Sequence, residues 1–173
     1  MGETTCRLGR EKEREREAGM AREAETSYFT YPTAHGPITI SASARGVTSV
    51  TFGEEPGSGR CAATDATNRA ATQIQEYLAG KRQSFDVPLD ANGSAFQQAV
   101  WAEVSAVPYG TTCTAADIAQ AIGKPGAHRA VGTAIRRNPV PILVPTHRVD
   151  LPNATGRTAK IFRALRALEQ DRR

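Results

Sequence analysis

The feature that most constrains the fold is a change of hydrophobic periodicity at the DANG segment, residues 90–93. Upstream of it, apolar residues alternate with polar ones, which is typical of half-buried strands. Downstream, apolar residues recur at every third or fourth position, which is typical of helices with one buried face. Because a strand pattern cannot serve as a helix pattern, we predict two structural units that meet at this segment.

The upstream unit is predicted to be a small antiparallel sheet with one helix. Alternating residues over 38–40 and 50–52 flank an Arg-Gly turn, which predicts a hairpin. Helical spacing over residues 71–78, followed by Gly80 as a stop, predicts a helix. Alternation over residues 85–89 predicts one further short strand before the break.

The downstream unit is predicted to be helical, and its helices begin at recognisable caps. Ser94 and Gln97 have the spacing of a capping box, and Thr114 and Asp117 have the same spacing. A third helix is predicted over residues 127–137, after a Lys-Pro-Gly turn. Two short helices joined by a tight turn have the form of a helix-turn-helix, although plain helical packing explains the same pattern.

The start of the chain alternates Glu with Arg or Lys and carries almost no large apolar side chains, so it cannot bury a face. We interpret it as a charged tail. The predicted organisation is a tail over residues 1–27, an α/β N-terminal domain over 28–92 and a C-terminal domain over 93–173.

Basic residues are concentrated after the break. Residues 94–173 contain 11 Lys and Arg against 5 Asp and Glu, whereas residues 1–93 contain 11 against 13. This asymmetry favours a polyanion such as DNA docking on the C-terminal half. A solvated basic surface explains the same counts.

Other classes of protein are disfavoured by the composition. Three widely spaced cysteines lack the spacing of a disulfide framework or a metal site, and we expect neither a metal nor a cofactor. No apolar run approaches the roughly 18 residues of a membrane helix, and the first residues lack the apolar region of a signal peptide. We therefore expect a cytoplasmic protein without a membrane partner.

The third predicted helix combines small residues with long cations. Ala127, Ala130 and Gly132 allow a close approach, while Arg129 and Arg136 extend from the same helix. This combination suits docking against DNA. Glycine inside a helix costs about 1 kcal/mol relative to alanine, so Gly132 is predicted to have either a docking reason or a helix-packing reason.

From Phe96 to Glu169 the chain resembles the O6-alkylguanine-DNA alkyltransferases, also called methylated-DNA-protein-cysteine methyltransferases. The matching segments are FQQAVWAEVSAVPYGTT, DIAQAIGKPGAHRAVGTAIRRNPVPILVPTHRV and the terminal ALE. The resemblance extends more loosely back to Tyr28. It implies a small antiparallel sheet domain followed by a mainly helical, winged-helix-type DNA-binding domain with a helix-turn-helix.

The resemblance also implies roles for individual residues. Arg129 matches the arginine that fills the gap left by a flipped guanine, and Asn138 matches the hinge asparagine. His147 matches the base that activates the acceptor through water, and Glu169 matches the carboxylate that orients it. The expected DNA-binding surface comprises Thr114, Ala115, Ala127, Arg129, Gly132, Arg136 and Arg148.

The chain departs from the family pattern at the acceptor, because Thr146 stands where the family has cysteine. A thiolate attacks a saturated carbon readily, whereas hydroxyl nucleophiles act on carbonyl or phosphoryl centres. The family tyrosine that assists base flipping is replaced by Ala115. The family's glycine- and tyrosine-bearing binding loop is replaced by DLPNATGRTAK, which leaves the recognition of alkylguanine open.

We therefore expect a monomeric DNA-repair-family protein that binds double-stranded, alkylated DNA without accepting the alkyl group and without a cofactor. The lesion would then be held for other repair proteins. Two alternatives stay open, namely a decayed paralogue that binds DNA without lesion preference and a working methyltransferase.

Overall fold

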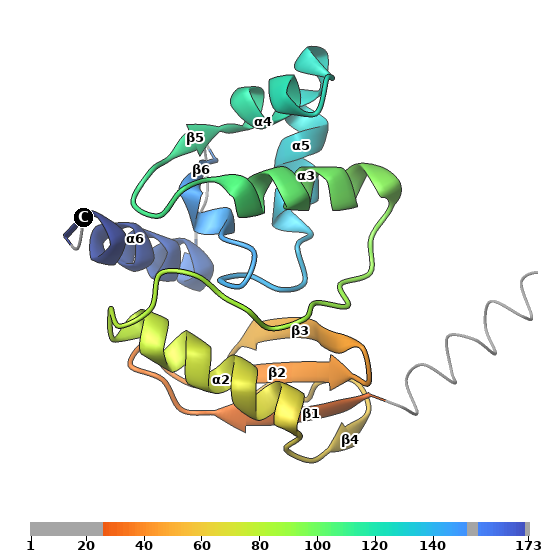
Figure 1. The fold of residues 1–173 in the computed structure, drawn as a ribbon, viewed down its shortest axis with the longest axis vertical. Helices are drawn as coiled ribbons and strands as arrows, with labels where there is room; N and C mark the ends of the chain where they lie inside the picture. The colour runs from red at the N-terminus through yellow and green to blue at the C-terminus, as the bar shows by residue number, and fades with distance from the viewer. Residues whose placement is uncertain (1–25, 152–155, 172–173) are drawn as a thin grey trace, which may run out of the picture.

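The structure, a computed structural model, describes the backbone of residues 26–151 and 156–171 (Figure 1). The predicted charged tail lies almost entirely outside the described residues. Part of the DLPNATGRTAK segment, residues 152–155, lies outside them as well.

The N-terminal unit contains a four-stranded sheet in the order β3-β2-β1-β4. The strands are β1 (Ser27–Tyr31), β2 (Ile38–Ser43), β3 (Gly46–Phe52) and β4 (Arg60–Cys61). β1, β2 and β3 pair in antiparallel register, which confirms the predicted hairpin, while β4 pairs parallel to β1. At the hairpin turn Gly46 has a φ of 151°, and a Cβ there would lie 2.4 Å from the carbonyl oxygen of Pro88. Glycine is therefore required at this turn.

Helix α2 (Asp65–Leu78) packs on one face of this sheet (Figure 1). It begins at a capping box in which Thr64 and Thr67 satisfy each other's backbone N–H groups, six residues earlier than the apolar spacing over residues 71–78 indicates. Ile74 and Tyr77 of α2 are fully buried, as is Ile40 of β2. The helix and the hairpin therefore share one core.

The predicted strand over residues 85–89 is wrong. Only an isolated bridge links Val47 with Leu89, with the Val47 N–H donating to the Pro88 carbonyl at 2.9 Å. Proline has no N–H to donate, so Pro88 interrupts any ladder that this segment could form. The segment runs instead as a connection along the sheet towards the C-terminal unit.

The C-terminal unit is mainly helical, as predicted. Its helices are α3 (Ala95–Ala106), α4 (Ala115–Ala121), α5 (His128–Arg136) and α6 (Gly156–Asp171). Both predicted capping boxes are present, at Ser94 before α3 and at Thr114 before α4. The two-residue strands β5 (Cys113–Thr114) and β6 (Val149–Asp150) pair in parallel.

Helices α4 and α5 pack together at the end of the molecule far from the four-stranded sheet (Figure 1). Gly123 ends α4 with a φ of 70°, and the short 3₁₀ helix η1 (Pro125–Ala127) leads into α5. The pair has the connectivity of a helix-turn-helix. The Trp101 indole N–H of α3 donates to the Ala134 carbonyl at 2.9 Å and fixes α5 against α3.

One hydrophobic core runs through both units, from Ile38 of β2 to Leu165 of α6. The edge strand β3 also makes a backbone contact with the C-terminal unit, because the Val50 N–H donates to the Pro139 carbonyl at 2.8 Å. This contact fixes the segment that leads to Thr146 against the sheet.

Candidate active site and DNA-binding surface

The segment between α5 and Thr146 is folded by its own polar contacts. The Asn138 side-chain oxygen accepts from the Val140 N–H at 3.0 Å, and the Val144 N–H donates to the Val140 carbonyl at 3.0 Å. Ile142 has a φ of 74°, in the left-handed region that non-glycine residues seldom occupy. The Asn138 amide thus begins a tight loop that returns the chain to the core at Thr146.

Thr146 is the first residue of the 3₁₀ helix η2 (Thr146–Arg148), and it is only 2% exposed. It forms part of the wall of a cleft of about 900 Å³. β3 supplies another wall of this cleft, and α6 supplies a third. The cleft is lined by residues that include Phe52, Arg136, Asn138, Pro141, Leu151, Phe162, Arg163 and Arg166.

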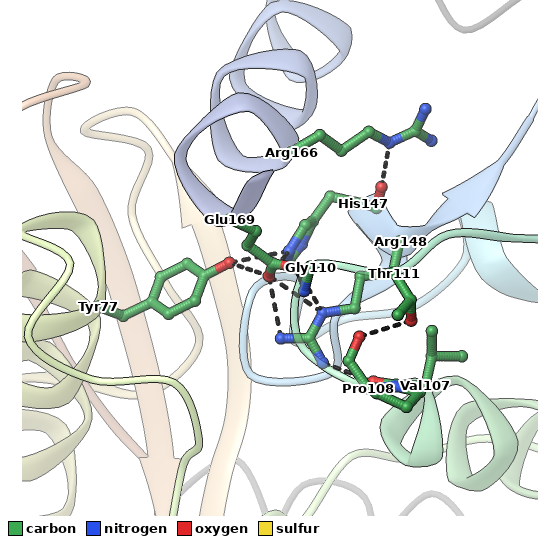
Figure 2. Close-up of polar contacts among 9 residues, drawn as sticks. All are labelled: Tyr77, Val107, Pro108, Gly110, Thr111, His147, Arg148, Arg166 and Glu169. Carbon is green, nitrogen blue, oxygen red and sulfur yellow. Dashed lines mark hydrogen bonds and ion pairs between the residues drawn. The ribbon is translucent and has the colours of Figure 1, made fainter. Parts of the chain in front are cut away.

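His147, beside Thr146, is fully buried and joined to Glu169 of α6 (Figure 2). Its Nε2 lies 2.8 Å from Glu169 Oε1 and 2.9 Å from the hydroxyl oxygen of Tyr77. The Tyr77 hydroxyl also donates to Glu169 Oε1 at 2.5 Å. The structure thus brings together the predicted His147–Glu169 pair and adds a tyrosine from α2.

The Glu169 carboxylate accepts further hydrogen bonds from two directions. Arg148 donates to it from Nε and from Nη2 at 2.9–3.1 Å, and the Gly110 N–H donates at 2.8 Å. Burial alone raises the pKa of Glu169, but hydrogen bonds from His147, Arg148, Tyr77 and Gly110 outweigh it and lower the pKa to about 2. Glu169 is therefore ionised at neutral pH.

His147 is neutral in this setting. Burial lowers the pKa of His147, and Arg148 and Arg166 lower it further, against the opposing effect of Glu169. An ionised Glu169 only accepts hydrogen bonds, so the network assigns the ring proton to Nε2. Nδ1 then carries a lone pair, and it is buried without a hydrogen-bond partner among the described residues. His147 thus keeps a proton-accepting nitrogen, as a general base requires.

Arg166 secures the segment that carries these residues. Its guanidinium donates to the backbone carbonyls of His147 and Val149, the second at 2.8 Å, and it pairs with the Asp150 carboxylate. Since Arg166 and Glu169 lie three residues apart on α6, both project towards η2. The site is therefore held to α6 through backbone as well as side-chain contacts.

Arg148 does not lie where the predicted DNA-binding surface requires it. The residue is 6% exposed, and its guanidinium is paired with Glu169 and with the Val107 carbonyl. A buried Glu169 charge requires such a partner. We therefore correct the prediction and assign Arg148 to the buried network instead of to DNA contact.

The other residues of the predicted surface lie on or near α4 and α5. Thr114, Arg129 and Arg136 are exposed, whereas Ala115 and Ala127 are half-buried. Arg136 also lines the cleft. The structure thus connects the α5 surface with the cleft that contains Thr146.

Gly132 of α5 is buried, but its packing leaves room for a side chain. The nearest side-chain atoms to a Cβ there would be Arg136 Nη1 at 3.6 Å and Leu151 Cδ2 at 3.8 Å, which is ordinary contact. The helix-packing reason predicted as one alternative for this glycine therefore finds no support among the described residues.

Tyr77, Arg166 and the aromatic pair Phe52–Phe162 are parts of the site that sequence reasoning missed. The Phe52 and Phe162 rings lie 6.4 Å apart in an edge-to-face arrangement, and the Phe162 ring lies 6.1 Å from His147. Tyr77 lies at one of the apolar positions of the spacing over residues 71–78, which indicates a core residue and no polar role. A buried tyrosine needs a partner for its hydroxyl, which is the one signal the sequence offered.

Among the described residues, no group of three or more His, Cys, Asp or Glu side chains is arranged to hold a metal ion. No helix in the described part of the chain is both long and apolar enough to span a membrane.

Comparisons with known proteins cover both units. A family model described as 6-O-methylguanine DNA methyltransferase, DNA binding domain, matches residues 95–172. A second model, described as the ribonuclease-like domain of 6-O-methylguanine DNA methyltransferase, matches residues 27–91.

Among curated relatives, the constitutive methylated-DNA–protein-cysteine methyltransferase of Bacillus subtilis is 52% identical over 80 residues, covering 46% of this chain and 48% of the relative. The corresponding protein of Mycobacterium bovis is 49% identical over 84 residues, covering 49% of this chain and 51% of the relative. The matched segment of the chain thus spans about half the length of these relatives.

Solved structures match over most of the chain. The O6-methylguanine methyltransferase of Mycobacterium tuberculosis is 36% identical, with a TM-score of 0.77, and the match covers 86% of this chain and 94% of that one. A structure described as Mycobacterium tuberculosis OGT in complex with DNA matches with a TM-score of 0.77 and 36% identity, covering 84% and 94% of the two chains. Because these matches extend over both units and nearly the whole length of a solved relative, the chain belongs to the O6-methylguanine DNA methyltransferase family.

Proposed function

We propose that this protein binds double-stranded DNA containing O6-alkylguanine and holds the altered base in its cleft without accepting the alkyl group. One observation carries the proposal. The buried Thr146, at the position where the family resemblance places the acceptor cysteine, stands in the cleft wall directly before the His147–Glu169 pair.

The chemistry of the acceptor supports the loss of transfer. A cysteine has a pKa near 8.5 and becomes a strong nucleophile once a neighbouring base takes its proton. The hydroxyl of Thr146 is far more basic as an alkoxide, and His147 is a weak base because burial lowers its pKa. Each 1.36 kcal/mol added to the barrier costs a factor of ten in rate. A weak base beside a hydroxyl therefore supports binding without transfer.

The exposed face of α5 supports DNA docking. Arg129 and Arg136 are exposed on this helix, and the Mycobacterium tuberculosis relative is described in complex with DNA. Gly132 has space for a Cβ but is buried on this helix, so it is not part of the exposed docking face. We assign to Arg129 the role of filling the gap left by the extruded base, and to Asn138 that of a hinge beside it.

The cleft has the dimensions and chemistry of a base-binding site. Its volume of about 900 Å³ lies within the range of small-molecule pockets. Phe52 and Phe162 give it apolar walls, and Arg136 and Arg163 give it polar donors. A planar base with several acceptor atoms suits such a lining.

The domain division at residues 28–92 and 93–173 is part of this proposal. It is supported by the family models, which match residues 27–91 and 95–172. DNA would dock on the second domain, while β3 of the first domain contributes one wall of the cleft.

The test is a competition gel shift at fixed salt, with identical duplexes that differ only in one guanine or one O6-methylguanine. The salt must be fixed because phosphate contacts alone change affinity steeply with ionic strength. Tighter binding of the lesion duplex is expected. Equal binding of both duplexes would favour the decayed paralogue, and no binding to either would overturn the proposal.

A working methyltransferase is the second candidate, favoured by the names of the curated relatives. It requires an acceptor atom. Cys61 is exposed and Cys113 half-buried, but neither lines the cleft. Burial also raises the pKa of Cys113, which keeps its thiol protonated.

A further inference from the structure

Tyr77 is the feature of the site that the proposed function does not use. It is fully buried near the end of α2, with its ring packed against Phe85 at 5.2 Å and Tyr109 at 6.2 Å. Its hydroxyl reaches out of the N-terminal unit and lies between Glu169 Oε1 and His147 Nε2 (Figure 2). The two residues it contacts both belong to the C-terminal unit.

The direction of the hydrogen bonds follows from the chemistry of the three groups. Glu169 is ionised and only accepts, so the single hydroxyl proton of Tyr77 is donated to it at 2.5 Å. The Tyr77 oxygen is then left as an acceptor, 2.9 Å from the Nε2 that carries the ring proton of His147. Burial raises the pKa of Tyr77, and its hydrogen bond to Glu169 raises it further, so the hydroxyl keeps its proton.

The opposite proton arrangement is excluded by the same contacts. If the His147 proton sat on Nδ1, it would be buried without an acceptor among the described residues, and the Nε2 lone pair would face the Glu169 carboxylate at 2.8 Å. A buried donor without a partner and two facing lone pairs are both unfavourable. The hydrogen bonds of the Tyr77 hydroxyl therefore fit only the arrangement in which the His147 ring proton is on Nε2.

We propose that Tyr77 is a positioning residue of this site: its hydroxyl, supplied by the N-terminal unit, orients the His147–Glu169 pair and holds the ring proton on Nε2. Nδ1 therefore keeps an unprotonated lone pair. The pair is complete only when α2 is packed against α6 and η2. This deepens the proposed function, because it names what keeps the pair ordered beside Thr146, and its test needs no DNA.

The first measurement uses the unaltered chain, labelled with ¹⁵N-histidine and observed by long-range ¹H–¹⁵N NMR. His147 is distinguishable because the chain has three histidines and the other two, His35 and His128, are exposed. We expect one neutral form of His147 with the proton on Nε2, and a through-space contact between this proton and a slowly exchanging tyrosine hydroxyl proton. A ring protonated on Nδ1 would overturn the proposal, as would the absence of a protected tyrosine hydroxyl.

The second measurement compares Tyr77→Phe with Tyr31→Phe. The control loses the same atom, because the Tyr31 hydroxyl bonds Thr67 and Asn68 of α2 at 2.8 Å, away from His147. In Tyr77→Phe we expect the Nε2 proton resonance to move and its exchange with water to accelerate at least about tenfold, since one of its two acceptors is gone. In Tyr31→Phe it should stay at the original position.

A purely structural role would lower the melting temperature in both variants and leave the His147 resonance unchanged. That result in a folded Tyr77→Phe protein would overturn the proposal. If Tyr77→Phe does not fold, the measurement on the unaltered chain decides, since it needs no substitution.

Discussion

At the scale of single residues, the site consists of the His147–Glu169 pair beside Thr146, the position at which we propose that the acceptor has been lost. The first prediction exchanges only the acceptor atom. In Thr146→Cys a thiol replaces the hydroxyl directly before His147, the neutral base to which the family resemblance assigns activation of the acceptor through water. We expect this variant to take up one benzyl group from O6-benzylguanine, measured by intact mass.

Thr146→Ser is the matched control for this experiment. It keeps the oxygen and removes only the methyl group, so we expect no label. A Thr146→Cys thiol that reacts with iodoacetamide but not with benzylguanine would contradict the idea that the acceptor alone limits transfer. It would assign a share of the loss to Ala115 and to the segment that follows Asp150.

A second prediction at this scale concerns pH. Burial first, and then Arg148 and Arg166, lower the pKa of His147 below its ordinary value of 6.5, and the Glu169 pKa falls from 4.5 to about 2. In both cases the unfolded chain binds more protons as the pH falls, so acid favours unfolding. The Glu169 contribution is complete above about pH 5 and is lost towards pH 2; it amounts to about 3 kcal/mol.

Urea unfolding at several pH values measures this effect. We expect the free energy of unfolding to begin falling below about pH 6.5, where His147 is protonated in the unfolded chain but not in the folded one. It should fall further below pH 5, where the same difference applies to Glu169. A stability that stays flat from pH 7 down to pH 4 would show that the buried network does not titrate as described.

At the scale of elements, α5 is the helix assigned to DNA. Arg129→Ala should weaken binding to duplex DNA by roughly tenfold, the order expected for one arginine contact. Arg60→Ala removes the same charge from exposed β4 of the N-terminal unit and should leave the affinity unchanged. Titrations at several salt concentrations measure both. Equal losses in the two variants would mean that net charge, and not α5, governs binding.

Gly132 allows a second test on the same helix. Since a Cβ at this position meets nothing closer than 3.6 Å outside its helix turn, Gly132→Ala should raise the free energy of unfolding by up to about 1 kcal/mol. Because Gly132 is buried, the same change should leave DNA binding unchanged. Thermal unfolding measures the first effect, and a destabilised variant would restore the helix-packing explanation.

At the scale of the whole molecule, local signals predicted the helices better than the sheet. The capping boxes at Ser94 and Thr114 were readable because a cap depends on residues within one turn. The parallel pairing of β4 with β1 was not, because it joins segments separated by two strands. The connection over residues 85–89 alternates like a strand, but Pro88 and the neighbouring hairpin decide its path.

The site, too, was predicted only in part from the sequence. The pairing of His147 with Glu169 was expected from the family resemblance and is present. The burial of Arg148 was not expected, because nothing in the sequence around it indicates that it pairs with Glu169 inside the protein. The Tyr77 contact was missed for a related reason, since it depends on how the two units pack and not on either segment alone.

The central claim is that the protein binds the lesion and leaves the alkyl group on it. The most direct measurement is intact mass spectrometry after incubation with excess duplex that carries one O6-methylguanine, under conditions where a gel shift shows the complex. We predict an unchanged protein mass and an unchanged lesion in the recovered DNA. A stoichiometric gain of one methyl group, mapped by peptide analysis to Thr146 or to any cysteine, would contradict the account.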